Sequence, residues 1–483
     1  MRRRKTPAQL VRSAIDTIQI ITNHAGGNGE DTKDGSSSIS SSSIVGLSFL
    51  EKVTNIKSHS SNCVDKQKDK DIQGGNPCSG GFLSSSSGSS SNGINGVKED
   101  VSRDIPTTNT EDDNDHSNQR ETNTATITTT TTTTTTENIE LTEPEKKLCS
   151  RLHEMKVILY GEAEKEVDEE KANELSRCIQ SESLLMILID HILIVPFEAR
   201  KDISQIFNNL VRKNIVNFVD YLEDCPILID ALIEGYNHPD IALISGSMLR
   251  ECIRHDSLAT CILKSEKLWL FFDKFLHLPN FDVASDAFNS LRDLLTTHKN
   301  KSISAEFLET NFERVFTKYE SLLLSENYVT KRRSLKLLSG ILLERINFNV
   351  MIRYISSKDN LKLIMNQLRD KSANIQFEAF HVFKIFVAYP NKPADISNIL
   401  FRNRVKLIAY LEAFHLDSED LQFHDEKRLL IETLHSLEEI DVSKSISASS
   451  SNTIEEQIDE KDVATSGISK LNVNENDGSD GLQ

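Results

Sequence analysis

The sequence lacks most features of secreted, membrane-spanning or nucleic-acid-binding proteins. Its seven cysteines are odd in number and scattered without a CxxC pair, which argues against a disulfide framework or a structural zinc site. No apolar run reaches the roughly 18 residues that a membrane span needs. The formal charge of −18 disfavours a general nucleic-acid binder, because phosphate contacts need a cationic surface. These absences predict a cytoplasmic protein without a membrane span or a nucleic-acid partner.

Known catalytic motifs are missing as well. The sequence has no GxxxxGK[ST] loop, no GxGxxG opening a helix, no HExxH, no GxSxG and no protein-kinase signature set. Cys252 and His255 have a spacing that two-ligand metal sites use, but no second pair accompanies them. His381 lies in an apolar stripe and is expected to pair within the core, and His255 and His298 are expected to end helices. We predict no enzyme activity, and no catalytic residue, metal, cofactor or small-molecule substrate.

Apolar residues are also missing from two long segments. Residues 25–142 hold serine-rich tracts and nine consecutive threonines at 128–136, and residues 441–483 are rich in Ser, Asn, Asp and Glu. Such segments bury too little apolar surface to offset the entropy of ordering. We predict a disordered Ser/Thr-rich insert at 25–142 and a disordered acidic tail at 441–483.

The remaining sequence has helical periodicity. Residues 7–24 carry apolar side chains three to four positions apart, as in an amphipathic helix. At Thr142 the string TEPEKK is typical of a helix start with early acids, and periodic stretches continue to Leu437. Alternating runs typical of strands are absent. The pattern predicts an all-α protein with a first helix at 7–24 and a helical domain at 143–440.

An internal repeat runs through the helical domain. Five similar segments begin 43, 42, 46 and 46 residues apart, at Glu198, Ile241, Val283, Val329 and Ile375. Eight residues further on they carry Ile206, Leu249, Leu291, Leu337 and Phe383, and twelve residues further on Leu210, Ile253, Leu295, Ile341 and Val387. These offsets keep the apolar side chains on one helical face. A period of this length is typical of armadillo and HEAT units, so we predict an armadillo/HEAT-like helical-repeat solenoid, a curved rod or horseshoe.

One helical face combines an aromatic ring with cations. In SENYVTKRRSLK the residues Tyr328, Arg332 and Lys336 fall at i, i+4 and i+8, on the same side of a helix. Tyr and Arg are enriched at interface hot spots, so this face could receive a partner that carries acids and an apolar anchor. A second basic and apolar group follows, made of Arg345, Phe348, Arg353, Lys362, Met365 and Arg369. The alternative is that both groups are solvated helix faces.

Several long strings match one known family. They are KDISQIFNNLVRK (201–213), IALISGSMLRECIRH (241–255), SENYVTKRRSLKLL (325–338) and NLKLIMNQLRDKSANIQFEAFHVFKIFVA (360–388). The chain resembles the calcium-binding protein 39 family, also called Mo-twenty-five scaffolds, over residues 143–437 and again at PAQLVRSAID (7–16). It departs from the family by the insert at 25–142 and by a longer tail, which look like the elaboration of a fungal member.

The resemblance implies a non-catalytic scaffold that binds and allosterically activates a Ste20-type kinase or pseudokinase. An NDR-type kinase would act downstream, in cell polarity, morphogenesis and cell separation, with the scaffold at sites of polarised growth or division in the cytoplasm. Tyr328, Arg332 and Lys336 match the family's contacts to the partner's regulatory helix. Lys362 is a matching neighbour of this group.

The resemblance also implies a second contact site. Arg345, Phe348 and Met365 match a pocket that receives a Trp-Glu-Phe tail of a pseudokinase in animal members. Arg402 stands where that pocket usually has lysine, which keeps the charge and changes the geometry of a carboxylate contact.

Two other functions stay open from the sequence. One is an adaptor that only localises its partners. The other is a transport or RNA-binding armadillo protein. A karyopherin-type transporter uses repeated Trp/Asn ladders, whereas this chain has a single tryptophan, Trp269, and an RNA-reading repeat protein needs regular base-reading triplets, which the sequence lacks.

Overall fold

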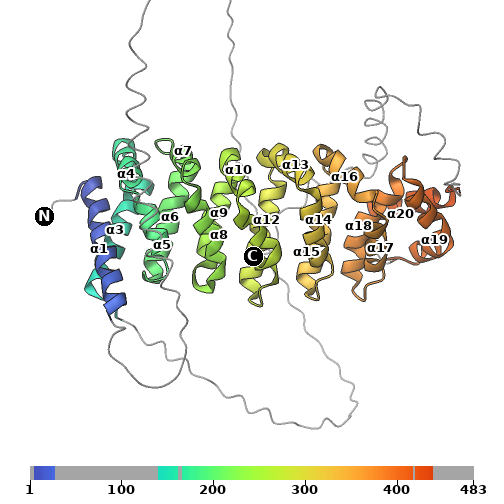
Figure 1. Ribbon diagram of the computed structural model, residues 1–483, viewed down its shortest axis with the longest axis horizontal. Coiled ribbons are helices and arrows are strands. Elements are labelled where there is room, and N and C mark those ends of the chain that lie inside the picture. Colours follow the sequence, from blue (N-terminus) through green and yellow to red (C-terminus); the bar gives the residue numbers. More distant parts are fainter. Residues whose placement is uncertain (1–4, 28–139, 162–165, 417–418, 439–483) are drawn as a thin grey trace, which may run out of the picture. The chain divides into compact units, whose positions relative to one another are not determined.

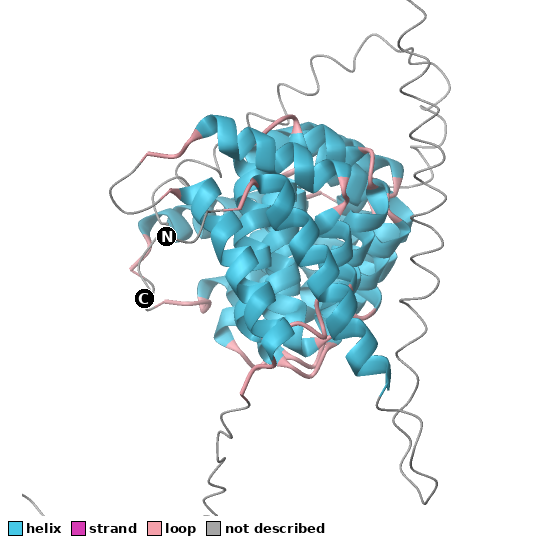
Figure 2. Ribbon diagram, turned by 90° about the vertical axis from the view of Figure 1, so that its left-hand side faces the viewer, coloured by secondary structure: helices cyan, strands magenta, loops and turns pink. Residues whose placement is uncertain are grey.

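The structure is a computed structural model that describes residues 5–27, 140–161, 166–416 and 419–438 (Figure 1). Every regular element in these ranges is a helix, as Figure 2 shows, so the predicted all-α class is confirmed. No helix in this part of the chain is long and apolar enough to cross a membrane. The predictions for the insert at 25–142 and the tail at 441–483 fall almost wholly outside the described residues.

The N-terminal helices are α1 (Pro7–Gly27), α3 (Glu143–Tyr160), α4 (Glu169–Ser181), α5 (Leu184–Asp190), α6 (Phe197–Lys213), α7 (Phe218–Glu223) and α8 (Pro226–Glu234). The central elements are η1 (Gly235–Asn237), α9 (Pro239–Ile253), α10 (Asp256–Lys264), η2 (Glu266–Leu268), α11 (Trp269–Asp273), η3 (Phe275–His277), α12 (Phe281–Thr296), η4 (His298–Asn300), α13 (Lys301–Thr310) and α14 (Phe312–Leu323). The C-terminal elements are α15 (Tyr328–Leu343), η5 (Arg345–Asn347), α16 (Phe348–Ile355), α17 (Lys358–Gln367), α18 (Ala373–Ala388), α19 (Ala394–Glu412) and α20 (Leu421–His435).

The expected helix start at Thr142 is present. Thr142 is the N-cap of α3, and its backbone N–H donates to Glu145 Oε2 at 2.7 Å in a capping box. Pro144 lies in the first turn, where a proline costs no hydrogen bond. Local chemistry therefore sets the boundary that the sequence indicated.

The five repeat segments form α6, α9, α12, α15 and α18. The ten apolar side chains at offsets eight and twelve are all buried, and none is more than 7% exposed. Burial of this continuous apolar stripe between neighbouring helices supplies the core of a repeat protein. The predicted solenoid of helical repeats is confirmed.

Successive repeat helices pack on one another in chain order, as Figure 1 shows. The series runs α3–α6–α9–α12–α15–α18–α20, and among these described helices the contact between α12 and α15 is the smallest. The helix α1 packs on α3 and α4 and buries Leu10, Val11, Ala14 and Ile18. Residues 7–27 therefore complete the same helical unit although more than a hundred residues separate them from α3 in the sequence.

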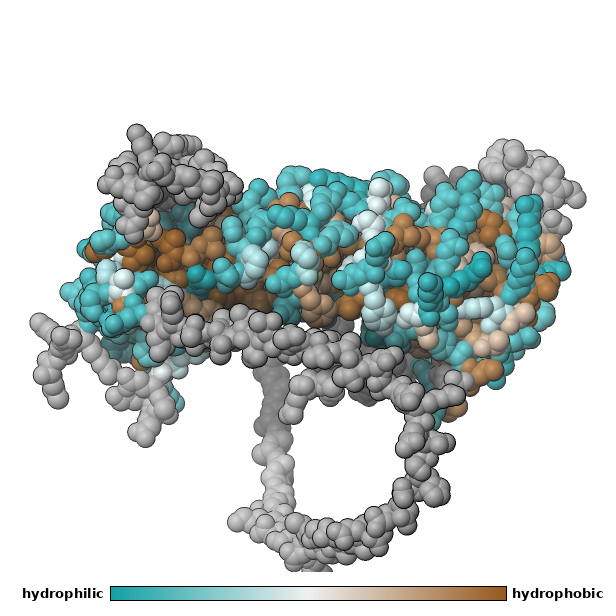
Figure 3. Space-filling model, turned by 90° about the horizontal axis from the view of Figure 1, so that it is seen from below, coloured by the Kyte–Doolittle hydropathy of each residue, from teal (hydrophilic) through white to brown (hydrophobic). Residues whose placement is uncertain are grey.

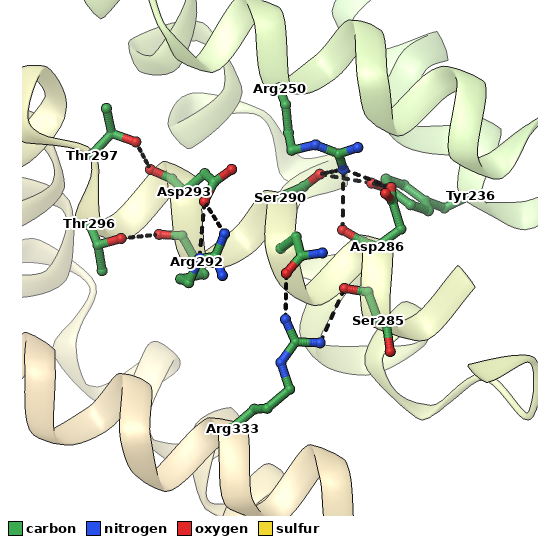
Figure 4. A network of polar contacts seen from close by, with 11 residues as sticks. Tyr236, Arg250, Ser285, Asp286, Ser290, Arg292, Asp293, Thr296, Thr297 and Arg333 are labelled. Atoms are coloured by element: carbon green, nitrogen blue, oxygen red, sulfur yellow. Dashed lines mark hydrogen bonds and ion pairs between the residues drawn. The ribbon is translucent and has the colours of Figure 1, made fainter. Parts of the chain in front are cut away.

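Buried and half-buried polar groups join neighbouring repeats. Arg250 Nη1 on α9 donates to Asp286 Oδ2 on α12 at 2.8 Å, and the Tyr236 hydroxyl donates to the same oxygen at 2.7 Å (Figure 4). Further along, the Lys384 ammonium donates to both Glu426 oxygens at 2.9 Å, with both side chains almost fully buried. Such pairs fix the relative position of neighbouring helices because each charge needs its partner once water is excluded.

Candidate functional site

The helix α15 carries the predicted aromatic and basic face. Asn327 begins it as N-cap, and its side-chain oxygen accepts hydrogen bonds from Val329 N at 2.9 Å and Thr330 N at 3.3 Å. The helix then presents four cations and no acid over YVTKRRSLKLLSGILL. Its exposed positions are Tyr328, Arg332, Lys336 and Gly340, each four residues from the last. We call these four residues the α15 stripe.

The first two residues of the α15 stripe are held from the neighbouring helix α18. Arg332 Nε donates to Glu378 Oε1 at 3.3 Å, and Asn374 Nδ2 donates to Tyr328 Oη at 3.0 Å. The Arg332 side chain is 46% exposed, whereas Glu378 is 8% exposed. A buried carboxylate thus orients a guanidinium whose side chain remains partly exposed.

The third residue, Lys336, has a different setting. Its side chain is exposed, and its ammonium makes no hydrogen bond or ion pair with the part of the chain that the structure describes. It lies close enough to His381 on α18 to act on that ring. Burial is the main cause that lowers the pKa of His381 to about 4, and the charges of Lys384 and Lys336 lower it further. Lys336 therefore presents an exposed cation without an ion-pair partner among the described residues.

The other two cations of α15 serve the fold. Lys331 pairs with Asp370 at 3.2 Å, in the segment that follows α17. Arg333 crosses to α12, where it donates to the Asn289 side chain and to the Ser285 carbonyl (Figure 4). Its guanidinium also stacks on Phe288, 4.4 Å from the ring centroid. Only Arg332 and Lys336 of this basic run are exposed.

The aromatic end of the stripe belongs to a wider pattern. The described surface is mostly polar with apolar patches between, as Figure 3 shows for the face seen from below. An exposed large apolar side chain occupies the first residue of four helices, namely Phe197, Phe281, Tyr328 and Leu421. Of these helices, only α15 follows it with two further exposed cations along the same stripe.

The structure places Lys362 apart from the stripe. It lies on α17, where its ammonium pairs with Asp359 at 3.0 Å, one turn earlier on the same helix. Exposed pairs of this kind contribute little stability, so Lys362 is available for other contacts.

The predicted tail pocket falls on successive C-terminal elements. Arg345 begins η5, Phe348 begins α16, Met365 lies on α17 and Arg402 lies on α19. α16 packs against α17, and α17 packs against α19. Phe348 and Met365 are half-buried, whereas Arg345 and Arg402 are exposed. The grouping of these four residues into one pocket stays a prediction.

His381, Cys252 and His255, which the sequence raised as possible ligands, lie in structural surroundings. His381 meets the Phe377 ring edge-on at 4.7 Å, in an aromatic cluster near α20. Cys252 is fully buried, which raises the pKa of its thiol, and burial lowers the pKa of His255. Among the described residues, no group of three or more His, Cys, Asp and Glu side chains could hold a metal ion.

Sequence analysis did not single out Asn374, Glu378 or Gly340. A signal for the first two was present: each lies 46 residues after its contact on α15, which is the spacing of these two repeats. Residues one period apart occupy equivalent positions on stacked helices, so they can lie side by side. Gly340 continues the i, i+4 series by one more step.

Comparisons with known proteins agree on one family. A family model described as Mo25-like matches residues 109–438, about two thirds of the chain. A human protein named "Calcium-binding protein 39-like" is 49% identical over 296 residues, which cover 60% of this chain and 87% of that protein. The "Mo25-like protein" of Schizosaccharomyces pombe is 45% identical, with 59% and 87% covered. The "Conidiophore development protein hymA" of Emericella nidulans is 35% identical, with 63% and 87% covered.

Proposed function

Because the chain belongs to the Mo25-like family, we propose that it is a non-catalytic scaffold that binds and activates a Ste20-type protein kinase or pseudokinase. The observation that carries the proposal is the α15 stripe. It presents Tyr328, Arg332 and Lys336, the residues that match the family's contacts, in one exposed line. A tyrosine followed by two cations suits a partner helix that carries an apolar anchor and carboxylates.

The mechanism we propose is a population shift in the kinase. A kinase domain exchanges between inactive and active positions of its regulatory helix, and a scaffold that binds the active position better increases its population. The α15 stripe suits this role because Asn374 and Glu378 already hold Tyr328 and Arg332 in place. Side chains fixed before binding lose little conformational freedom on binding, so more of the binding free energy remains to favour the active conformation of the kinase.

A second contact would involve Arg345, Phe348, Met365 and Arg402. Two half-buried apolar side chains and two exposed cations would together suit a short partner segment with an aromatic residue and a carboxylate, such as a Trp-Glu-Phe tail. Lys362, on α17, would add a further cation to these contacts. Two contacts on one partner raise the overall affinity through effective concentration.

We place this activity in the cytoplasm, in a network for cell polarity, morphogenesis and cell separation, with an NDR-type kinase downstream. The developmental role in the printed name of the Emericella nidulans relative supports such a setting. An RNA-binding function is disfavoured by the net charge of −18, because a nucleic-acid partner needs a cationic face.

The test is the activity of a purified Ste20-type kinase with and without the full chain, as wild type and as Arg332→Ala. The proposal expects wild type to bind the kinase and raise its activity, and Arg332→Ala to bind about 30-fold more weakly. Binding by wild type without a change in activity would instead favour an adaptor that only localises its partner. Absence of binding would contradict the kinase assignment.

A further inference from the structure

The exposed line on α15 is longer than the three residues that the sequence singled out. Its positions fall at every fourth residue, and the fourth position is Gly340. Every other side chain of α15 is buried or half-buried. The stripe therefore runs from an aromatic ring through two cations to a residue without a side chain.

A glycine inside a helix weakens it relative to alanine, so its presence needs a reason. For two other glycines, Gly235 and Gly246, packing within the chain supplies that reason. A Cβ at Gly235 would collide with the Ser245 side chain, and a Cβ at Gly246 would collide with the Asp286 carboxylate and the Tyr236 hydroxyl.

Gly340 differs from both. A Cβ built on it meets no atom of the chain within 4 Å, and its backbone is ordinary helix. Packing among the described residues thus gives no reason for a glycine at this position. A close approach from outside the chain would give one, because a glycine lets another main chain come nearer than any side chain allows.

We propose that a helix of the partner crosses α15 at Gly340, with its main chain closest to α15 at that point. This inference rests on the proposed function and specifies the geometry of the contact. A close crossing needs a small residue on both helices, so the partner helix carries Gly, Ala or Ser where it faces Gly340.

Charge fixes a second feature of the partner helix. Lys336 lies one turn from Gly340, about 6 Å along the axis, and its ammonium has no ion pair in the described chain. Lys331 and Arg333 are engaged with Asp370 and Asn289, and Arg332 already shares Glu378. A carboxylate on the partner helix, three or four residues from its small residue, would reach Lys336 from the same face. The surface thus fits a helix with a small residue and an acid one turn apart.

The experiment uses the full chain and the Ste20-group kinase domains of its source organism, each expressed singly, with affinity and thermal unfolding measured on the same samples. Gly340→Ala places a methyl group, and Gly340→Leu a larger side chain, in the space that the partner helix would occupy. Ser321→Ala on α14 is the matched control, because it also raises helix propensity at an exposed position but lies on another helix. Arg332→Ala reports on the proposed function by itself.

We expect Gly340→Ala to raise the unfolding midpoint and to weaken kinase binding about tenfold or more, since an added methyl overpacks the crossing. Gly340→Leu abolishes binding, and Ser321→Ala stabilises the chain without a change in affinity. Wild-type affinity in both Gly340 variants, together with weakened Arg332→Ala, overturns this inference and leaves the proposed function standing. Weakening by Ser321→Ala as well would mean that helix stiffening is the cause, and it overturns the inference too. Absence of binding by wild type overturns both.

Discussion

Arg332 makes a contact within the fold and is proposed to contact the partner, and mutation can separate the two. Its side chain is half-exposed, as a partner contact requires, but its guanidinium also pairs with the buried Glu378 at 3.3 Å. Arg332→Ala should stay folded, but it loses the contact between α15 and α18 that this ion pair makes.

The two effects enter different equilibria. Loss of this ion pair lowers the free energy of unfolding by about 1–3 kcal/mol, because solvent screens the guanidinium but the buried Glu378 carboxylate loses a hydrogen-bond donor. A domain of this kind is stable by about 5–15 kcal/mol, so more than about 95% of the variant remains folded. Loss of a hot-spot arginine lowers the binding free energy by about 2 kcal/mol or more, which is about 30-fold in affinity. The binding loss therefore cannot follow from unfolding.

Two further variants make the test decisive. Lys336→Ala should keep the unfolding free energy within about 0.5 kcal/mol and still weaken kinase binding, because its ammonium has no partner in the described chain. Glu378→Gln should lower stability as Arg332→Ala does while binding falls less, because the guanidinium stays in place. Chemical denaturation and calorimetric titration of the same samples give both quantities. If affinity falls in proportion to stability across the three variants, Arg332 is a structural residue and the argument fails.

Other features of the fold lead to three expectations. Lys384→Met should destabilise the chain by about 3–5 kcal/mol in denaturant unfolding, because Glu426 is then buried without its cation. The double variant Lys384→Met/Glu426→Leu should recover most of the lost stability, and an equal loss in the single and double variants would contradict the ion-pair argument. Replacing residues 28–139 by a flexible linker of about 15 residues should leave the melting temperature unchanged or slightly raised, because closing a shorter loop on folding costs less entropy. A large drop in melting temperature would mean that the insert packs on the helices. His381→Leu should flatten the pH dependence of stability between pH 6.5 and about 4. In this range the unfolded chain takes up a proton at His381, whereas the folded ring, with its pKa lowered to about 4, stays neutral, so wild type loses stability as pH falls, by at most about 1.4 kcal/mol per pH unit. An unchanged profile in the variant would refute the assignment.

The repeat helices could be predicted closely from the sequence because their signal is local. Apolar residues such as Leu249 and Leu291 recur on one face of each segment, and the same residues are buried against the neighbouring helix. Helix starts such as Thr142 follow from side-chain chemistry within one turn. These features need no knowledge of which helices meet.

The site could be predicted only in part, because its geometry depends on how two repeats stack. Spacing placed Tyr328, Arg332 and Lys336 on one face, and that face is exposed. The partners of the first two, Asn374 and Glu378, lie one period later, but a period alone does not say that equivalent residues face each other. That depends on the rotation and separation of α15 and α18, which packing of the whole row determines.

The basic run at 331–333 shows why composition alone overestimates the positive charge that α15 exposes. Consecutive residues on a helix point about 100° apart, so three adjacent cations face three directions. Lys331 reaches Asp370, Arg332 lies against α18 and solvent, and Arg333 crosses to α12 at the smallest contact in the row. Among the cations of α15, only Arg332 and, one turn further, Lys336 are exposed. Two cations in line behind an aromatic ring suit one or two carboxylates on a helix, whereas a phosphate backbone needs many more contacts. The arrangement of α15 thus argues for a protein partner on the geometry of its charges as well as on their number.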